Sequence, residues 1–142
     1  MILFIDDEPR IMDSYRLYLE RQLTPDGYQI AFYSNVDEAL EYFESHLDEV
    51  DLIILDIMMP PGERFSGNRT NGGLKTGLFL YDKIRENSPD LPLVIFTNFS
   101  DEDVEKRLRQ DRKCRFLQKA DYLLDDFVGE VRKSLSRSSS QE

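Results

Sequence analysis

The chain has 142 residues, of which 40% are hydrophobic, so it is long enough for one domain with a core and too short for two ordinary domains. Acidic residues outnumber basic ones by 28 to 18, and the formal net charge of −10 argues against nucleic acid or an anionic membrane surface as the main partner. A single cysteine (Cys114), no apolar run long enough to span a bilayer and no visible export signal predict a cytoplasmic protein without an internal disulfide.

Short β-rich runs alternate with longer runs of helical periodicity along the chain. In chain order, the pattern predicts a strand at 2–5, a helix from Pro9 to about 24, a strand at 28–33, a helix capped by Ser34 and ending near 46, a strand at 52–55, a helix at 77–87, a strand at 93–96, a helix capped by Ser100 and ending near 110, a strand at 116–117 and a helix at 122–135.

The strand at 52–55 is apolar at four successive positions, which is typical of a parallel sheet covered by helices on both faces. Five strands alternating with five helices predict βαβ units with right-handed crossovers. We therefore expect an α/β fold, a doubly wound five-stranded parallel sheet in three α/β/α layers, over residues 1–135. The serine-rich segment 136–142 is expected to be a disordered tail.

Polar side chains follow four of the predicted strands. Asp6 and Asp7 follow the first, Asp56 the third, Thr97 the fourth and Lys119 the fifth. The carboxyl ends of parallel strands share one crevice, where three carboxylates would repel one another unless a cation neutralised them. Oxygen ligands without a Cys or His cluster favour Mg²⁺, and a carboxylate beside Mg²⁺ and an ammonium suits phosphoryl transfer.

These residues, in this order, resemble the receiver domain of bacterial two-component response regulators. The resemblance covers nearly the whole chain and rests on five motifs: Asp6-Asp7, Asp56, the Met58-Met59-Pro60 that closely follows it, Thr97 and Lys119. It implies a flavodoxin-like receiver fold and a role in two-component, phosphorelay signal transduction. It also implies that the chain is not an enzyme beyond its own phosphorylation and dephosphorylation.

The resemblance assigns a role to each of these residues. Asp56 would accept a phosphoryl group from a sensor histidine kinase or a histidine phosphotransfer protein. Asp7, Asp56 and the backbone carbonyl of Met58 would bind Mg²⁺ directly, with Asp6 acting mainly through water. Lys119 would pair with the acyl phosphate.

A switch pair is also implied. The Thr97 hydroxyl would move toward the phosphoryl group while the aromatic ring of Phe116 rotates inward. The change would reach the surface formed by the fourth helix and fifth strand, where a downstream protein or a second copy would bind. That surface carries a local concentration of positive charge, although it could also be an ordinary solvated helix face. Its basic residues are Lys106, Arg107, Arg109, Arg112, Lys113 and Arg115, with only Asp111 opposing them.

Three features depart from the family pattern. Ala120 follows Lys119 where the family usually has Pro after a cis peptide, and without Pro a cis bond is disfavoured by a few kcal/mol. Asn98 follows Thr97 where a small residue is usual, so its side chain would restrict access to the site or contact the phosphoryl group. The loop at 60–76 carries about a dozen extra residues and is expected to be either a mobile insertion or a binding element.

Other interpretations stay open. A phosphohydrolase resembling the haloacid dehalogenase group would use Asp6 as its nucleophile, but that group has a second Asp two residues later, where this chain has Glu8. A pseudo-receiver would keep the fold as a protein-binding module without being phosphorylated. The receiver could stand alone or be a fragment of a larger regulator.

Overall fold

The computed structural model describes residues 1–59 and 76–139 and contains one sheet flanked by helices. Its elements are β1 (Ile2–Ile5), α1 (Pro9–Leu23), η1 (Thr24–Asp26), β2 (Ile30–Tyr33), α2 (Val36–Ser45), β3 (Leu52–Leu55), α3 (Thr76–Asn87), β4 (Leu93–Thr97), α4 (Glu102–Arg109), β5 (Cys114–Gln118), η4 (Lys119–Asp121) and α5 (Leu124–Ser139).

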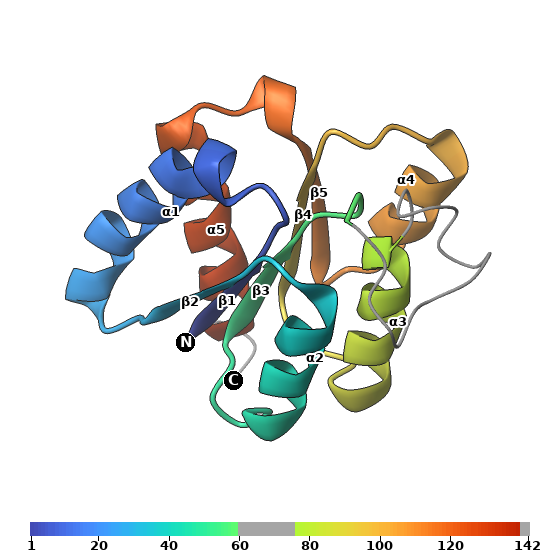
Figure 1. The fold of residues 1–142 in the computed structure, drawn as a ribbon, viewed down its shortest axis with the longest axis horizontal. Coiled ribbons are helices and arrows are strands. Elements are labelled where there is room, and N and C mark those ends of the chain that lie inside the picture. The colour runs from blue at the N-terminus through green and yellow to red at the C-terminus, as the bar shows by residue number, and fades with distance from the viewer. Residues whose placement is uncertain (60–75, 140–142) are drawn as a thin grey trace.

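The five strands are all parallel and lie in the order β2-β1-β3-β4-β5. Helices α1 and α5 cover one face of the sheet, and α2, α3 and α4 cover the other (Figure 1). This arrangement confirms the predicted doubly wound α/β fold. None of the described helices is both long and apolar enough to cross a membrane.

The core is divided by the sheet into two clusters, and alternate residues of each central strand belong to different clusters. In β3, Ile53 and Leu55 pack toward α2, α3 and α4, whereas Leu52 and Ile54 pack toward α1 and α5. All four are fully buried. Burial on both faces explains why this strand is a continuous apolar run in the sequence.

Two predicted helix caps were wrong by one residue. Asn35, not Ser34, caps α2, because its Oδ1 accepts from the backbone N–H groups of Asp37 (2.9 Å) and Glu38 (3.1 Å). Asp101, not Ser100, caps α4 in the same way. Asn and Asp are at least as good as Ser at this position, so a serine beside either residue does not decide the start.

The predicted element ends differ most near the C-terminus. Strand β5 is longer than the two apolar residues at 116–117, because Arg115 and Gln118 also belong to this edge strand. Helix α5 begins at Leu124 and continues to Ser139, beyond position 135, so the first part of the predicted tail is helical. Residues 140–142 lie outside the described residues.

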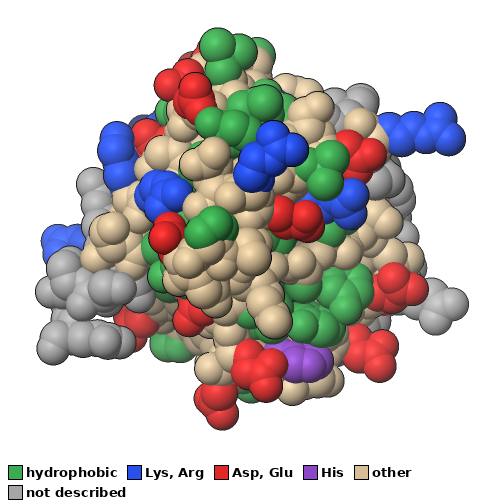
Figure 2. Space-filling model, turned by 90° about the vertical axis from the view of Figure 1, so that its left-hand side faces the viewer, with side chains coloured by type: hydrophobic (Ala, Val, Ile, Leu, Met, Phe, Trp, Pro, Cys, Tyr) green, Lys and Arg blue, Asp and Glu red, His purple; other side chains and the backbone are tan. Residues whose placement is uncertain are grey.

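Two other sequence features can be placed in part. The loop expected at 60–76 lies outside the described residues except for Thr76, which begins α3. The Lys119–Ala120 bond is trans, since the described residues contain no cis peptide. On the face in Figure 2, the lower edge carries acidic side chains without basic ones, whereas acidic and basic side chains are mixed above it.

Candidate phosphoryl and metal site

Three carboxylates meet at the carboxyl ends of β1 and β3. Asp6, Asp7 and Asp56 each offer an oxygen within 4.8 Å of the other two. Asp6 and Asp56 are buried, with exposed fractions of 0% and 4%, and Asp7 is half-buried. The parallel pairing of Ile5 with Leu55 ends both strands at the same level and so brings these residues together.

Lys119 bridges two of the carboxylates from η4, directly after β5. Its Nζ lies 2.8 Å from Asp6 Oδ2 and 3.0 Å from Asp56 Oδ2. The other oxygen of Asp56, Oδ1, accepts hydrogen bonds from the Thr97 hydroxyl (2.5 Å) and the Met58 backbone N–H (3.1 Å). The Asp56 carboxylate is therefore held in a fixed orientation by donors on both of its oxygens.

One ammonium does not balance three carboxylates. Burial, together with the charge of Asp56, raises the pKa of Asp6 to about 6, and the same two causes raise the pKa of Asp7. Burial disfavours the Lys119 ammonium, but the charges of Asp56 and Asp6 outweigh it and raise the pKa of Lys119. Electrostatically, the site therefore favours an added cation or an added proton.

The donor atoms fit a hard divalent cation. Asp7 Oδ1 is buried and accepts no hydrogen bond within the described part of the chain, which is costly for a carboxylate oxygen. A cation among the three carboxylates would satisfy it. Mg²⁺ prefers oxygen ligands, often one or two carboxylates with waters, so the residues present fit this ion.

Stability in the absence of metal should depend on pH in an unusual direction. A folded pKa of about 6 for Asp6, above its ordinary value of 3.8, means that the folded state binds more protons than the unfolded state between these values. The contribution of this carboxyl group to stability is then present at low pH and is lost as pH rises through about 6. We expect the free energy of unfolding in a chelating buffer to be about 1 kcal/mol higher at pH 5 than at pH 7.

Urea denaturation at the two pH values checks this expectation, with Asp6→Asn as the comparison. The variant should lose most of the difference. Asp111, whose pKa is lowered mainly by its bonds to Arg85 and Tyr81 despite its burial, acts in the opposite direction, but only below about pH 4. Equal stability at pH 5 and pH 7, or a difference unchanged in the variant, would contradict the assignment.

The sequence gives no signal for a second set of bonds behind the site. Thr97 Oγ1 also accepts from the backbone N–H of Phe99 (3.1 Å), and the Gln118 side-chain amide donates to the Phe99 carbonyl (2.9 Å). The start of the β4–α4 loop is thus tied both to the hydroxyl that contacts Asp56 and to the edge strand. Movement of the Thr97 hydroxyl would disturb its bond with the Phe99 N–H.

The remaining candidate residues lie around the site. Phe116 is buried in the core on the α4 side of the sheet, and the guanidinium of Arg109 lies 5.7 Å from its ring centroid. Asn98 is exposed at the end of β4, and the Met58 side chain is 38% exposed. The switching, access and metal-binding roles of these three residues stay predictions.

A family model described as the response regulator receiver domain matches residues 2–123. The chain belongs to the response regulator receiver family. This receiver is 34% identical over 100 residues to the probable transcriptional regulator ycf27 of Cyanidium caldarium, covering 70% of this chain and 32% of that protein. It is 33% identical over 105 residues to the regulatory protein VanR of Enterococcus faecium, covering 74% of this chain and 36% of that protein.

Solved structures support the same fold. A response regulator receiver domain protein from Clostridium thermocellum superposes with a TM-score of 0.76 at 22% identity, covering 99% of this chain and 98% of that one. The chain spans about a third of the length of the two curated relatives. The family places it among two-component signalling proteins.

Proposed function

We propose that the receiver is a Mg²⁺-dependent phospho-acceptor whose nucleophile is Asp56. The observation that best supports this is the set of contacts to its carboxylate. Lys119 lies at Oδ2, the Thr97 hydroxyl and the Met58 N–H donate to Oδ1, and two further carboxylates lie close by. A nucleophile held in one orientation beside an ammonium and a cation site suits phosphoryl transfer.

The transfer would proceed in one displacement. An Asp56 oxygen attacks the phosphorus of a phosphohistidine on a sensor histidine kinase or phosphotransfer protein. The P–N bond breaks, its electron pair returns to the imidazole, and an acyl phosphate forms. Lys119 neutralises charge on the phosphoryl oxygens, and the Thr97 hydroxyl turns from the carboxylate to one of them.

Asp7, Asp56 and the Met58 carbonyl would hold Mg²⁺, with Asp6 acting mainly through water. When bound, the ion supplies positive charge to the phosphoryl oxygens and relieves repulsion among the carboxylates. Asp7 Oδ1 is buried and has no hydrogen-bond partner among the described residues, which supports this assignment. Without the ion, the three carboxylates would have only the Lys119 ammonium to balance their charge when the phosphoryl group arrives.

Phosphorylation would shift an equilibrium between two conformations. Thr97 is linked through Phe99 to Gln118 on β5, and Phe116 lies on the same strand beneath Arg109 of α4. This chain of contacts runs from Asp56 to the surface of α4 and β5. We propose that a downstream protein or a second copy reads the state there, in the cytoplasm.

The magnesium requirement gives the first test. Incubation with acetyl phosphate and millimolar Mg²⁺ should add one phosphoryl group to the intact chain by mass spectrometry, and a chelator should reduce labelling at least about tenfold. Failure to label at any Mg²⁺ concentration would favour a pseudo-receiver. Sustained turnover of small phosphate esters would favour a phosphohydrolase.

A further inference from the structure

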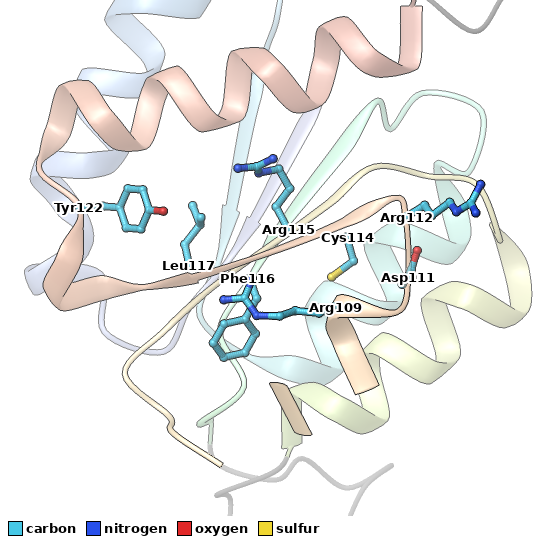
Figure 3. Close-up of a pocket in the computed structure, with 8 residues that line it drawn as sticks. All are labelled: Arg109, Asp111, Arg112, Cys114, Arg115, Phe116, Leu117 and Tyr122. Carbon is cyan, nitrogen blue, oxygen red and sulfur yellow. The ribbon is translucent and has the colours of Figure 1, made fainter. Parts of the chain in front are cut away.

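The edge of the sheet at β5 carries a pocket that the phosphoryl chemistry does not use. Its volume is about 500 Å³, and its lining includes Arg109, Arg112, Arg115 and Phe116. In Figure 3, Arg115 projects from β5 toward α5, whereas Cys114, Phe116 and Arg109 lie on the opposite side of the strand. The pocket therefore follows the strand edge between α4 and α5.

The backbone at this edge has no neighbouring strand within the described residues, since β5 pairs with β4 alone. Lys113 O accepts from Leu93 N, so the ladder directs the backbone groups of Lys113, Arg115 and Leu117 toward β4. In a parallel ladder the alternate residues, Phe116 among them, direct theirs outward. An open edge of this kind can accept an added strand.

The charge at the pocket is positive where the rest of the chain is negative. Its one acidic lining residue, Asp111, is already bound by Arg85 Nε (2.7 Å) and by the Tyr81 hydroxyl (2.5 Å). Two of the arginines form an ion pair with one carboxylate each. Arg109 Nη2 lies 2.8 Å from Glu105 Oε1, and Arg115 Nη2 lies 2.6 Å from Glu130 Oε2. Arg112 is exposed. The charge of the pocket arginines is thus only partly compensated.

We propose that the β5 edge is a docking site for an extended, acidic segment of a partner protein, which adds as a strand beside β5 and places carboxylates on Arg112 and Arg109. Addition of an extended strand beside β5 supplies backbone hydrogen bonds, and the arginines supply selectivity for acidic side chains. This deepens the proposed function by naming the chemistry of the output partner, and only its control by Asp56 rests on the phosphorylation itself.

Two other occupants fit less well. A second copy would present the same arginines across a two-fold axis, and like charges would then face one another. A nucleic acid would meet a chain of net charge −10, which repels its phosphates beyond the pocket. An acidic peptide is short enough to contact the basic pocket alone.

Control by the phosphoryl site has a physical route. Arg109 stacks on Phe116, so a change in the Phe116 ring moves one of the two arginines that the acidic segment would contact. The affinity for the acidic segment and the equilibrium for phosphorylation at Asp56 are then coupled, and each changes the other by the same factor.

The test uses the full chain and a blocked, fluorescent peptide in which Glu alternates with Val. We expect saturable binding by anisotropy, with NMR shifts confined to the amides of β5 and its flanks and slower amide exchange at Phe116. The same peptide with Gln in place of Glu should bind at least about tenfold more weakly. Arg112→Glu should weaken binding by a similar factor. Arg21→Glu, an equal charge change on the last turn of α1, should leave it within about twofold.

Asp56→Asn should bind the acidic peptide like the unphosphorylated wild type, so a failure of phosphorylation would not be mistaken for a failure of docking. The proposal is overturned by no binding, by equal binding of the Gln peptide, or by insensitivity to Arg112→Glu. Dimerisation through this edge in sedimentation, or tighter binding of a DNA or RNA oligonucleotide, would replace the proposed partner with one of the other two.

Discussion

Replacing Asp56 with Asn should abolish labelling by acetyl phosphate in the presence of Mg²⁺, with a loss of at least about a hundredfold. The side-chain amide keeps the size of the carboxylate and can keep the contact with Thr97, but its neutral oxygen is a very poor nucleophile. The variant should stay folded, since removing one of three mutually repelling carboxylates also relieves repulsion in the site. Mass spectrometry of the intact chain measures the loss.

Asp6→Asn is the matched control for this change. It removes a neighbouring carboxylate that also contacts Lys119 but leaves Asp56 in place, so labelling should continue, with a higher Mg²⁺ requirement. The opposite pattern, with labelling lost in Asp6→Asn and kept in Asp56→Asn, would assign the nucleophile to Asp6 and favour the phosphohydrolase alternative.

Gly77→Ala should be the most destabilising single substitution near the site. A Cβ at Gly77 would lie against the Asp56 carbonyl oxygen and 2.5 Å from Ile57 Cα, and both are backbone atoms that cannot rotate away. The Gly77 N–H also donates to the Ile57 carbonyl (2.8 Å). We expect a loss of about 3 kcal/mol or more in the free energy of unfolding, because the start of α3 and the segment after β3 must separate.

Gly129→Ala provides a control of opposite sign. Gly129 lies inside α5, and among the described residues a Cβ there would meet no atom within 4 Å apart from the neighbouring backbone of its own helix, so alanine should stabilise the protein by up to about 1 kcal/mol through its helix propensity. Urea denaturation of both variants makes the comparison. A Gly77→Ala protein as stable as the wild type would show that the close approach of α3 to Ile57 is absent in solution.

The sheet and the set of residues in the site could be predicted from the sequence for a physical reason. Central strands such as β3 are buried on both faces and therefore appear as continuous apolar runs. Parallel connections bring the carboxyl ends of strands together, so Asp6, Asp56 and Lys119 could be expected to meet once the strands were known. The structure places all three within contact distance.

Other features depend on contacts that no local pattern encodes. Gln118 reaches Phe99 across 19 residues, and Arg85 reaches Asp111 across 26. Both bonds depend on how the helices and loops pack against the sheet. The sequence predicts only residues 116–117 of β5 because Arg115 and Gln118 interrupt its apolar pattern, as is usual for an edge strand. The sequence does not distinguish Asn35 and Asp101, which cap α2 and α4, from the serines at 34 and 100 beside them, since several residue types occupy the N-cap position.

The most direct measurement is the position of the phosphoryl group on the wild-type chain. After incubation with acetyl phosphate and Mg²⁺, borohydride reduction converts an aspartyl phosphate to homoserine, which peptide mass spectrometry can locate. We expect homoserine at position 56 and unmodified aspartate at positions 6 and 7. Homoserine at position 6, or none at position 56, would contradict the proposal that Asp56 is the acceptor.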